Sequence, residues 1–239
     1  MLFKIANVTY AYNDNIVFDN ISVDIQKGEF LVLMGENGQG KSTFIDLITG
    51  FKHSKNGEIY FKEEKIAKIL KDNKRKQAFY SKIGILFQDT DIQLFNQTVY
   101  DEIAFGLRQM KMSEAEIAQR VVDVLKLLKI ESLSHRIPYQ LSGGEKKKVA
   151  FASIMVMNPE IYILDEPFNN LSKKSEELIK EILRELHHIG KTIILSSHHF
   201  KSIQEEKATI LLFENGETHY YTPKEVQEHP AIQEKLSQY

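Results

Sequence analysis

The sequence predicts an α/β fold with an antiparallel β lobe and a helical lobe, and three observations predict it. A glycine-rich turn stands between an apolar run, Phe30–Met34, and a helical pattern that begins at Lys41. Apolar and polar residues alternate in short runs over residues 2–26, which is typical of antiparallel strands. Apolar residues recur at helical spacing over residues 98–133, where no strand pattern interrupts them.

Composition and charge narrow the class of protein. With 239 residues, 42% of them hydrophobic and 27% charged, the chain is typical of a globular protein with a sizeable core. A net charge of -2 provides no basic field that would favour nucleic acid. No cysteine is present, which excludes disulfides and thiolate metal sites and agrees with a reducing compartment. No signal peptide is predicted and no apolar run approaches the ~20 residues of a membrane span, so we expect a cytoplasmic protein.

The predicted β lobe begins with two strands in residues 2–26, separated by the turn Asn13-Asp14-Asn15, and Gly57–Phe61 adds another strand. Tyr10 and Tyr12 lie just before the turn, and cross-strand packing alone would explain both. Residues 62–77 are dense in lysine. We expect a solvated face there and not a nucleic-acid surface, because aromatic residues are not interleaved.

The glycine-rich turn fits the pattern G-x-x-x-x-G-K-[ST] of a phosphate-binding loop (P-loop) at Gly35, Gly40, Lys41 and Ser42. Glycines let successive backbone N–H groups curl around a polyphosphate, and the helix that follows directs its positive end at that charge. Lys41 would reach the β and γ phosphates, and the Ser42 hydroxyl would hold Mg²⁺. We expect the helix to end at Gly50.

The predicted helical lobe follows a strand, residues 82–87, which ends in Gln88 at an edge where α/β sheets bind ligands. Ser113 and Glu116 predict a capping box for the second helix of residues 98–133. Leu141–Glu145 precede a further helix, and their Ser-Gly-Gly turn is either a second anion-binding place or an ordinary helix cap.

Two adjacent carboxylates, Asp165 and Glu166, end the short apolar strand Ile161–Leu164. Neighbouring side chains at a strand end point in different directions, so one can serve Mg²⁺ through a water while the other faces a γ-phosphate. A helix is predicted over Glu176–His188 and a strand over Thr192–Leu195.

Two histidines, His198 and His199, follow the last of these strands. Neighbours on a strand face opposite sides and no further ligand is suitably spaced, which argues against a metal site. The dipeptide Asn215-Gly216 then predicts a hairpin between residues 210–213 and 217–221, and one or two final helices follow.

With these motifs in one order, the chain resembles the ATP-binding cassette (ABC) ATPases from about Phe3 to Leu236. The matching positions are Gly35–Thr43 for the Walker A loop, Gln88 for the Q-loop glutamine, Leu141–Glu145 for the LSGGQ signature, Asp165 and Glu166 for the Walker B pair, His198 for the switch histidine, and Tyr12 for the aromatic residue that stacks on adenine.

The resemblance implies one domain over residues 1–239. A RecA-like P-loop NTPase core with the β lobe would occupy about 1–90 and 158–222, the helical lobe about 91–157, and a short helical tail 223–239. Two cassettes would meet head to tail around two ATP molecules. Each ATP would lie between the Walker A loop of one subunit and the signature helix of the other.

The resemblance also assigns roles to individual residues, with ATP and Mg²⁺ as cofactors. Lys41 would neutralise phosphate charge, Glu166 would accept a proton from the attacking water, and His198 would hold the γ-phosphate and water in line. Mg²⁺ would be held by Ser42, Gln88 and Asp165. The residues expected to contact ATP are Tyr12, Asn37, Gly38, Gly40, Lys41, Ser42, Thr43, Gln88, Ser142, Gly143 and Gly144.

The segment Phe87–Leu107 is similar to the cobalt-type and energy-coupling-factor branch of the family, whose members drive uptake of vitamins, nickel or cobalt. This implies three partners: a second ABC ATPase subunit, identical or not, a transmembrane coupling subunit, and a substrate-binding membrane subunit. The chain would lie on the inner face of the cell membrane. It departs from the branch at Thr90, where proline is usual, at Ser172, where the D-loop has aspartate, and at Glu145, where the signature has glutamine.

Other functions of an ABC ATPase stay as alternatives. A soluble ATPase of the iron–sulfur assembly type has a similar size and differs in the segment Phe87–Leu107. DNA-repair types insert a long coiled coil, whereas only about a hundred residues separate Lys41 from Leu141 here, and translation types carry two cassettes. A non-catalytic interaction protein is disfavoured because Lys41, Glu166 and His198 are all present.

Overall fold

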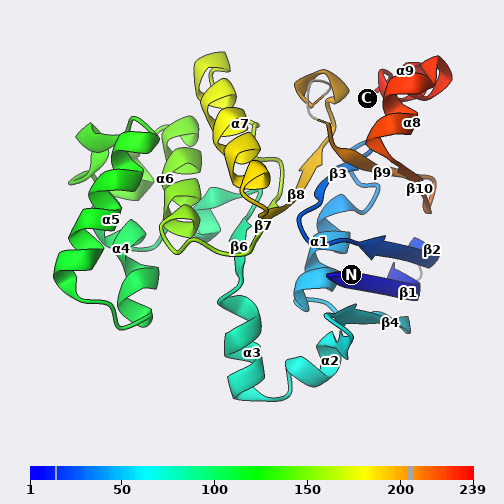
Figure 1. Cartoon of the computed structure of the whole chain (residues 1–239), viewed down its shortest axis with the longest axis horizontal. Helices are drawn as coiled ribbons and strands as arrows, with labels where there is room; N and C mark the ends of the chain where they lie inside the picture. The colour runs from blue at the N-terminus through cyan, green and yellow to red at the C-terminus, as the bar shows by residue number, and fades with distance from the viewer. Residues whose placement is uncertain (14, 204–206) are drawn as a thin grey trace. The chain divides into compact units, whose positions relative to one another are not determined.

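The computed structural model describes residues 1–13, 15–203 and 207–239 (Figure 1). The chain forms two compact units. The first consists of Met1–Lys82 with His187–Tyr239, and the second of Ile83–Leu186. The second unit includes strands as well as helices, so its bounds are not those of the predicted helical lobe, and the predicted lobe boundaries stay a prediction.

The first unit contains the predicted antiparallel sheet. Strand β1 (Phe3–Tyr12) lies between β2 (Asn15–Ile25) and β4 (Asn56–Phe61), and the short β5 (Glu64–Lys65) pairs with β4. The prediction of antiparallel strands in residues 2–26 is therefore confirmed. In the predicted turn, Asn13 has a φ of 52°, and Asp14 lies outside the described residues.

The phosphate-binding loop follows a parallel strand of the same unit. Strand β3 (Phe30–Met34) runs parallel to β8 (Thr192–Ser197) on one side and β9 (Thr209–Glu214) on the other. All five β3 side chains are buried, as a parallel strand covered on both faces requires. The hairpin is also confirmed: β10 (Glu217–Tyr221) returns antiparallel to β9 through residues 215–216, both at positive φ.

Short helices complete the first unit. Helix α1 (Lys41–Thr49) ends at Gly50, whose φ is 78°, as predicted. Helices α2 (Ile66–Ile69) and α3 (Asn73–Tyr80) carry the lysine-rich segment, in which most charged side chains are exposed. A 3-10 turn, η4 (Phe200–Ser202), follows β8, and α8 (Pro223–Glu228) and α9 (Pro230–Leu236) are the expected final helices.

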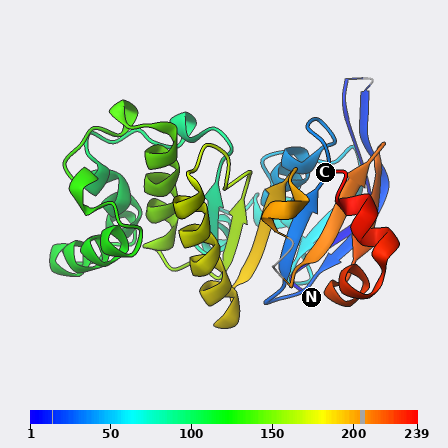
Figure 2. The same cartoon turned by 90° about the horizontal axis from the view of Figure 1, so that it is seen from above.

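The second unit is built from two strands and four helices of the described chain. Strands β6 (Ile83–Leu86) and β7 (Ile161–Leu164) are parallel. Figure 2 shows the green helices α4, α5 and α6 packed together. The helices and 3-10 turns of this part of the chain are η1 (Thr90–Ile92), α4 (Val99–Gln109), α5 (Glu114–Leu127), η2 (Glu131–Leu133), η3 (Pro138–Gln140), α6 (Gly143–Met155) and α7 (Lys173–His188).

Caps fix where these helices begin. Ser113 and Glu116 form the predicted capping box of α5. Helix α7 starts three residues before the predicted position, because the Ser172 hydroxyl accepts a hydrogen bond from the backbone N–H of Ser175 at 3.3 Å. Among the described residues, no helix has both the length and the apolar character that crossing a bilayer demands.

Candidate functional site

The loop between β3 and α1 has a backbone that only glycine can supply at two positions. Gly35 has a φ of 143°, and an added Cβ would lie 2.5 Å from the Phe213 carbonyl oxygen. Gly40 has a φ of 101°, and an added Cβ would lie 2.6 Å from the Phe18 ring. The two glycines therefore let the loop turn tightly against β9 and β2 before α1 begins.

Lys41 closes this loop from the inside. It is the first residue of α1, only 6% exposed, and its Nζ donates to the carbonyl oxygens of Gly35 at 2.6 Å and Glu36 at 3.0 Å. Asn37 and Gly38 are exposed residues of this loop. An ammonium group, the start of a nine-residue helix and exposed loop residues thus lie together, which suits a polyphosphate.

Tyr12, at the end of β1, lies beside the same helix. Its hydroxyl is 3.2 Å from the Thr43 hydroxyl, its ring stands edge-on to Tyr10 at 5.1 Å, and 44% of the residue is exposed. The structure therefore brings Tyr12 together with the predicted loop and leaves much of its surface open to a ligand. Tyr10 and Tyr12 share one side of the strand, as their spacing predicts.

Two residues near Tyr12 were not identified from the sequence. The Lys52 ammonium lies 5.5 Å from the centre of the Tyr12 ring and pairs with the Asp46 carboxylate. Burial acts to lower the pKa of Lys52, but hydrogen bonds to Asp46 and Tyr12 raise it to about 12. Burial acts to raise the pKa of Tyr12, but hydrogen bonds to Thr43 and Lys52 leave it lowered. The cluster therefore carries a fixed cation beside the Tyr12 ring.

His198 follows β8, whose last residue is Ser197. The rings of His198 and His199 lie 3.9 Å apart, so the expectation that they face opposite sides is wrong. The strand ends before them, and the His199 N–H instead bonds the Ser197 hydroxyl at 3.1 Å in a turn, where strand alternation no longer applies. Within the described residues, no group of three or more His, Cys, Asp or Glu side chains could hold a metal ion.

In the second unit, the parallel strands β6 and β7 bring three predicted residues to one edge. Gln88 lies two residues after β6, and Asp165 and Glu166 follow β7 directly. The Asp165 N–H donates to the Leu86 carbonyl at 2.8 Å, which extends the pairing of the strands. Asp165 and Glu166 are 7% and 5% exposed. Glu166 has a φ of 48°, an uncommon backbone conformation for a residue with a side chain.

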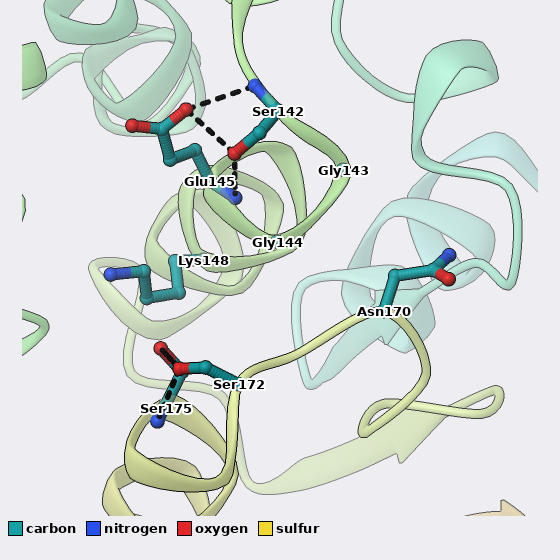
Figure 3. Close-up of a pocket in the computed structure, with 8 residues that line it drawn as sticks. All are labelled: Ser142, Gly143, Gly144, Glu145, Lys148, Asn170, Ser172 and Ser175. Carbon is teal, nitrogen blue, oxygen red and sulfur yellow. Dashed lines mark hydrogen bonds between the residues drawn. The ribbon is translucent and has the colours of Figure 1, made fainter.

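The predicted signature turn forms the start of α6. Ser142 is the N-cap, and Glu145 completes a capping box by accepting hydrogen bonds from the Ser142 N–H at 2.9 Å and hydroxyl at 2.7 Å. These bonds lower the pKa of Glu145, so it is a carboxylate at neutral pH. A pocket of about 500 Å³ lies beside this turn. It is lined by Ser142, Gly143, Gly144, Glu145, Lys148, Asn170, Ser172 and Ser175, which Figure 3 shows.

This pocket combines groups that bind an anion. The exposed Ser142 and Gly143 present the N-terminus of a thirteen-residue helix, and Lys148 adds an ammonium group. The negative charge of the Glu145 carboxylate offsets part of the positive charge of these groups. Ser142, Gly143 and Gly144, all predicted to contact ATP, are thus together at one surface of the second unit.

The residues predicted to hold Mg²⁺ have suitable chemistry. Ser42 offers a hydroxyl, Gln88 an amide and the buried Asp165 a carboxylate, which are the oxygen donors that Mg²⁺ prefers. A single carboxylate is enough when phosphate oxygens and water complete the octahedron. Each of these groups, taken by itself, is a donor that suits a magnesium ion bound to a nucleotide. Ser42 belongs to the first unit, and Gln88 and Asp165 belong to the second.

Comparison with known proteins gives a consistent result. Residues 18–169 match the family described as "ABC transporter". The nickel import ATP-binding protein LarO of Lactiplantibacillus plantarum is 40% identical over 240 residues, with 98% of this chain and 99% of LarO covered. The energy-coupling factor transporter ATP-binding protein EcfA1 of Fusobacterium nucleatum is 34% identical, with 92% of this chain and 81% of EcfA1 covered.

A solved structure extends the likeness to the fold. The dimeric, post-hydrolysis structure of the ATP-binding cassette MJ0796 with ADP and Pi superposes with a TM-score of 0.83 at 29% identity. The superposition covers 93% of this chain and 99% of that one. The arrangement of strands and helices around the loop is thus shared with a nucleotide-binding cassette.

Proposed function

Because this chain belongs to the ABC transporter family, whose ATP-binding subunits hydrolyse ATP to power transport, we propose that it drives an energy-coupling-factor type importer of a vitamin or a transition-metal ion. The observation that carries the proposal is the 40% identity to a nickel import ATP-binding protein over nearly the whole of both chains. The importer-like segment Phe87–Leu107 lies within the matched length and agrees with it.

The first unit binds the nucleotide in this proposal. The loop backbone from Asn37 to Gly40 and the start of α1 hold the phosphates, and the Lys41 ammonium exchanges its two carbonyl partners for phosphate oxygens. The ring of Tyr12 stacks on the adenine of the same nucleotide, and its hydrogen-bond distance to Thr43 and its exposure support this role.

Hydrolysis then requires a positioned water and a proton acceptor. Glu166 accepts the proton of the attacking water, and His198 orients that water and the γ-phosphate. Gln88 contacts water or the metal ion. Ser42, Gln88 and Asp165 would hold Mg²⁺, which would supply positive charge to offset the charge of the phosphates.

A second cassette completes each ATP site. The pocket at Ser142–Gly144 presents a helix N-terminus and the Lys148 ammonium, which suit the γ-phosphate of an ATP bound to the other subunit. The dimeric form of MJ0796 supports this assembly by analogy. We propose that the partner is a different cassette that carries the D-loop aspartate, because in this chain the Ser172 hydroxyl lines the same pocket where the family has a carboxylate.

The partner in the membrane would contact an apolar surface next to η1. Ile92 and Phe95 are 69% and 66% exposed, and the Phe95 ring packs edge-on against the half-exposed Phe105 at 5.0 Å. The buried Glu102 carboxylate holds this loop in place by accepting the N–H groups of Phe95 at 2.9 Å and Asn96 at 2.8 Å. Exposed aromatic residues on a firmly held loop are typical of a docking site.

We propose that this surface binds a transmembrane coupling subunit, and that a separate membrane subunit binds the transported substrate. The chain would then be a peripheral protein on the inner face of the cell membrane. The iron–sulfur assembly alternative is not favoured, because relatives that cover most of this chain are named as import or transporter ATP-binding proteins.

The proposal is tested by purifying the tagged chain from membranes in mild detergent and identifying what co-purifies by mass spectrometry. We expect a polytopic membrane protein, and its loss in a Phe95→Asp variant that still binds ATP. Uptake of radioactive nickel, cobalt and vitamins by cells that express the complex then identifies the substrate, with Lys41→Ala as the inactive control. Co-purification with soluble iron–sulfur assembly proteins alone would contradict the proposal.

A further inference from the structure

Helix α6 contains three consecutive lysines, and the structure gives each a different surrounding. Successive side chains on a helix diverge by about 100°. Lys146 forms an ion pair with Asp91 at 2.6 Å, and Lys148 lines the pocket in front of the signature turn. Lys147 points into the interior of the second unit and is 3% exposed. It is the one member of the run that is buried.

The buried Lys147 ammonium bonds the backbone of two residues of the predicted catalytic site. Its Nζ donates to the carbonyl oxygen of Gln88 at 3.1 Å and to that of Glu166 at 3.3 Å. These carbonyls follow two different strands, β6 and β7, so one side chain ties both strand ends to α6. Burial lowers the pKa of Lys147, and the carboxylates of Asp165, Glu166 and Asp89 act in the opposite direction.

The hydrogen bond from Lys147 acts on a Glu166 backbone that has an unusual conformation. Its φ of 48° lies in the left-handed region, which is uncommon for a residue with a side chain and costs free energy that the surroundings must offset. The Glu166 carbonyl accepts from Lys147 and, at 3.4 Å, from the Asn169 N–H. The direction of the Glu166 carboxylate depends on that backbone, because the Cα–Cβ bond turns with φ and ψ.

We propose that Lys147 is a positioning residue for ATP hydrolysis, which holds the backbone of Glu166 and Gln88 so that the Glu166 carboxylate meets the attacking water. The inference rests on the proposed role of Glu166 as the proton acceptor. Lys147 does not touch the nucleotide in this account, so its removal lowers the rate of the chemical step and leaves ATP binding unchanged. A displacement of about 1 Å at a reacting group lowers a rate by up to ~10²-fold.

The first experiment compares steady-state ATP hydrolysis by the full chain, or by its complex if hydrolysis requires the partner. Lys147→Met keeps the length of the side chain but donates no hydrogen bond. We expect its kcat to fall about 10- to 100-fold, with KM for ATP within about 2-fold of the parent. Lys147→Arg, which keeps charge and donors, should recover part of the rate. Lys146→Met is the matched control and should stay within about 2-fold of the parent.

A second measurement separates positioning from a general loss of structure. Lys147→Met should still form a dimer on addition of ATP, as measured by sedimentation, because its binding groups are untouched. The double variant Lys147→Met/Glu166→Gln should hydrolyse ATP no more slowly than Glu166→Gln alone, since a residue that acts through Glu166 has no further effect once Glu166 is replaced. Additive losses would overturn the proposal.

The other possible outcomes also decide whether Lys147 has a positioning role. A kcat of Lys147→Met equal to the parent, or a parallel loss of kcat and ATP-dependent dimerisation, overturns the positioning role. If Lys147→Met does not fold, Lys147→Gln and Lys147→Arg are compared by the same division between kcat and KM and judged in the same way. If Glu166→Gln itself keeps full turnover, the assignment of Glu166 as the base is wrong. If Glu166→Gln loses turnover and the Lys147 variants keep it, only the positioning role of Lys147 is overturned.

Discussion

Tyr12 offers a prediction whose size follows from the structure. Tyr12 is 44% exposed as a residue and its hydroxyl lies 3.2 Å from the Thr43 hydroxyl in the first turn of α1, so its ring can present a face to the adenine of a bound nucleotide. Stacking of a base on an aromatic ring contributes about 1–3 kcal/mol. At about 1.4 kcal/mol per factor of ten, Tyr12→Ala should weaken ATP binding about 5- to 150-fold.

Two variants separate the ring from its surroundings. Tyr12→Phe keeps the ring and loses the hydrogen bonds of the hydroxyl to Thr43 and Lys52, each of about 0.5–1.5 kcal/mol and neither made to ATP, so it should bind ATP much more tightly than Tyr12→Ala. Tyr10→Ala removes the ring that packs edge-on against Tyr12 and should have the smaller effect. All three affinities can be measured by calorimetry with a non-hydrolysable ATP analogue, after thermal unfolding shows that each variant is folded.

Inorganic tripolyphosphate is the control ligand, because it has the phosphates of ATP without the base. Its affinity should be the same for Tyr12→Ala and the parent. An equal loss for ATP and tripolyphosphate would mean that the loop had been disturbed and that stacking was not measured. Unaltered ATP affinity in Tyr12→Ala, together with a loss in Tyr10→Ala, would refute the assignment and transfer the role to Tyr10.

Three further predictions concern the phosphates and the dimer. Lys41→Ala should abolish the rise in Tm that ATP produces, a stabilisation of about 2.7 kcal/mol in the parent at 100 times Kd, and an unchanged rise would exclude this loop. Ser172→Asp keeps a good N-cap and restores the carboxylate that is usual in the D-loop, so it should raise the rate of ATP hydrolysis by the homodimer. Full ATPase activity of the unmodified chain alone, with no increase in Ser172→Asp, would instead favour a homodimer in the transporter. Glu145→Gln keeps the capping box but removes a negative charge beside Ser142. The dimerisation constant in the presence of ATP, measured by sedimentation, should therefore rise about 2- to 5-fold. An unchanged constant would mean that solvent screens this charge.

Much of the fold could be predicted because its signals are local. The strand Phe30–Met34 was predicted to the residue, since five apolar residues between polar ones and a glycine leave little choice. The strand Ile161–Leu164 was predicted from a similar apolar run, and the capping box at Ser113 from the glutamate three residues later. Asn215-Gly216 predicted its hairpin because both residues accept positive φ.

The boundaries that were missed depend on contacts at the ends of elements. Strand β8 continues two residues beyond Leu195, because Leu33 and Met34 of β3 pair with Ser196 and Ser197. The sequence shows only small polar residues there, which are typical of a loop. The error about His198 and His199 has the same origin, since it assumed strand geometry beyond the point where the strand ends.

In the candidate site, the sequence motifs identified the residues that belong to them. They did not identify Lys147 and Lys52, which contact those residues. Lys147 lies among three identical residues, and nothing in that run indicates which one is buried. Lys52 lies after α1 and outside any helical pattern, and only the fold brings its ammonium group near the Tyr12 ring. The individual roles given to the motif residues stay predictions until they are measured.

The central claim is that this chain hydrolyses ATP with Glu166 as the proton acceptor, and one variant tests it most directly. Glu166→Gln keeps the size of the side chain and removes its basicity. Steady-state release of phosphate should fall by the ~10² to 10⁴ typical of losing a positioned general base, while ATP still binds and an ATP-bound dimer accumulates during sedimentation. Phosphate release at the parent rate by the folded variant would contradict the account.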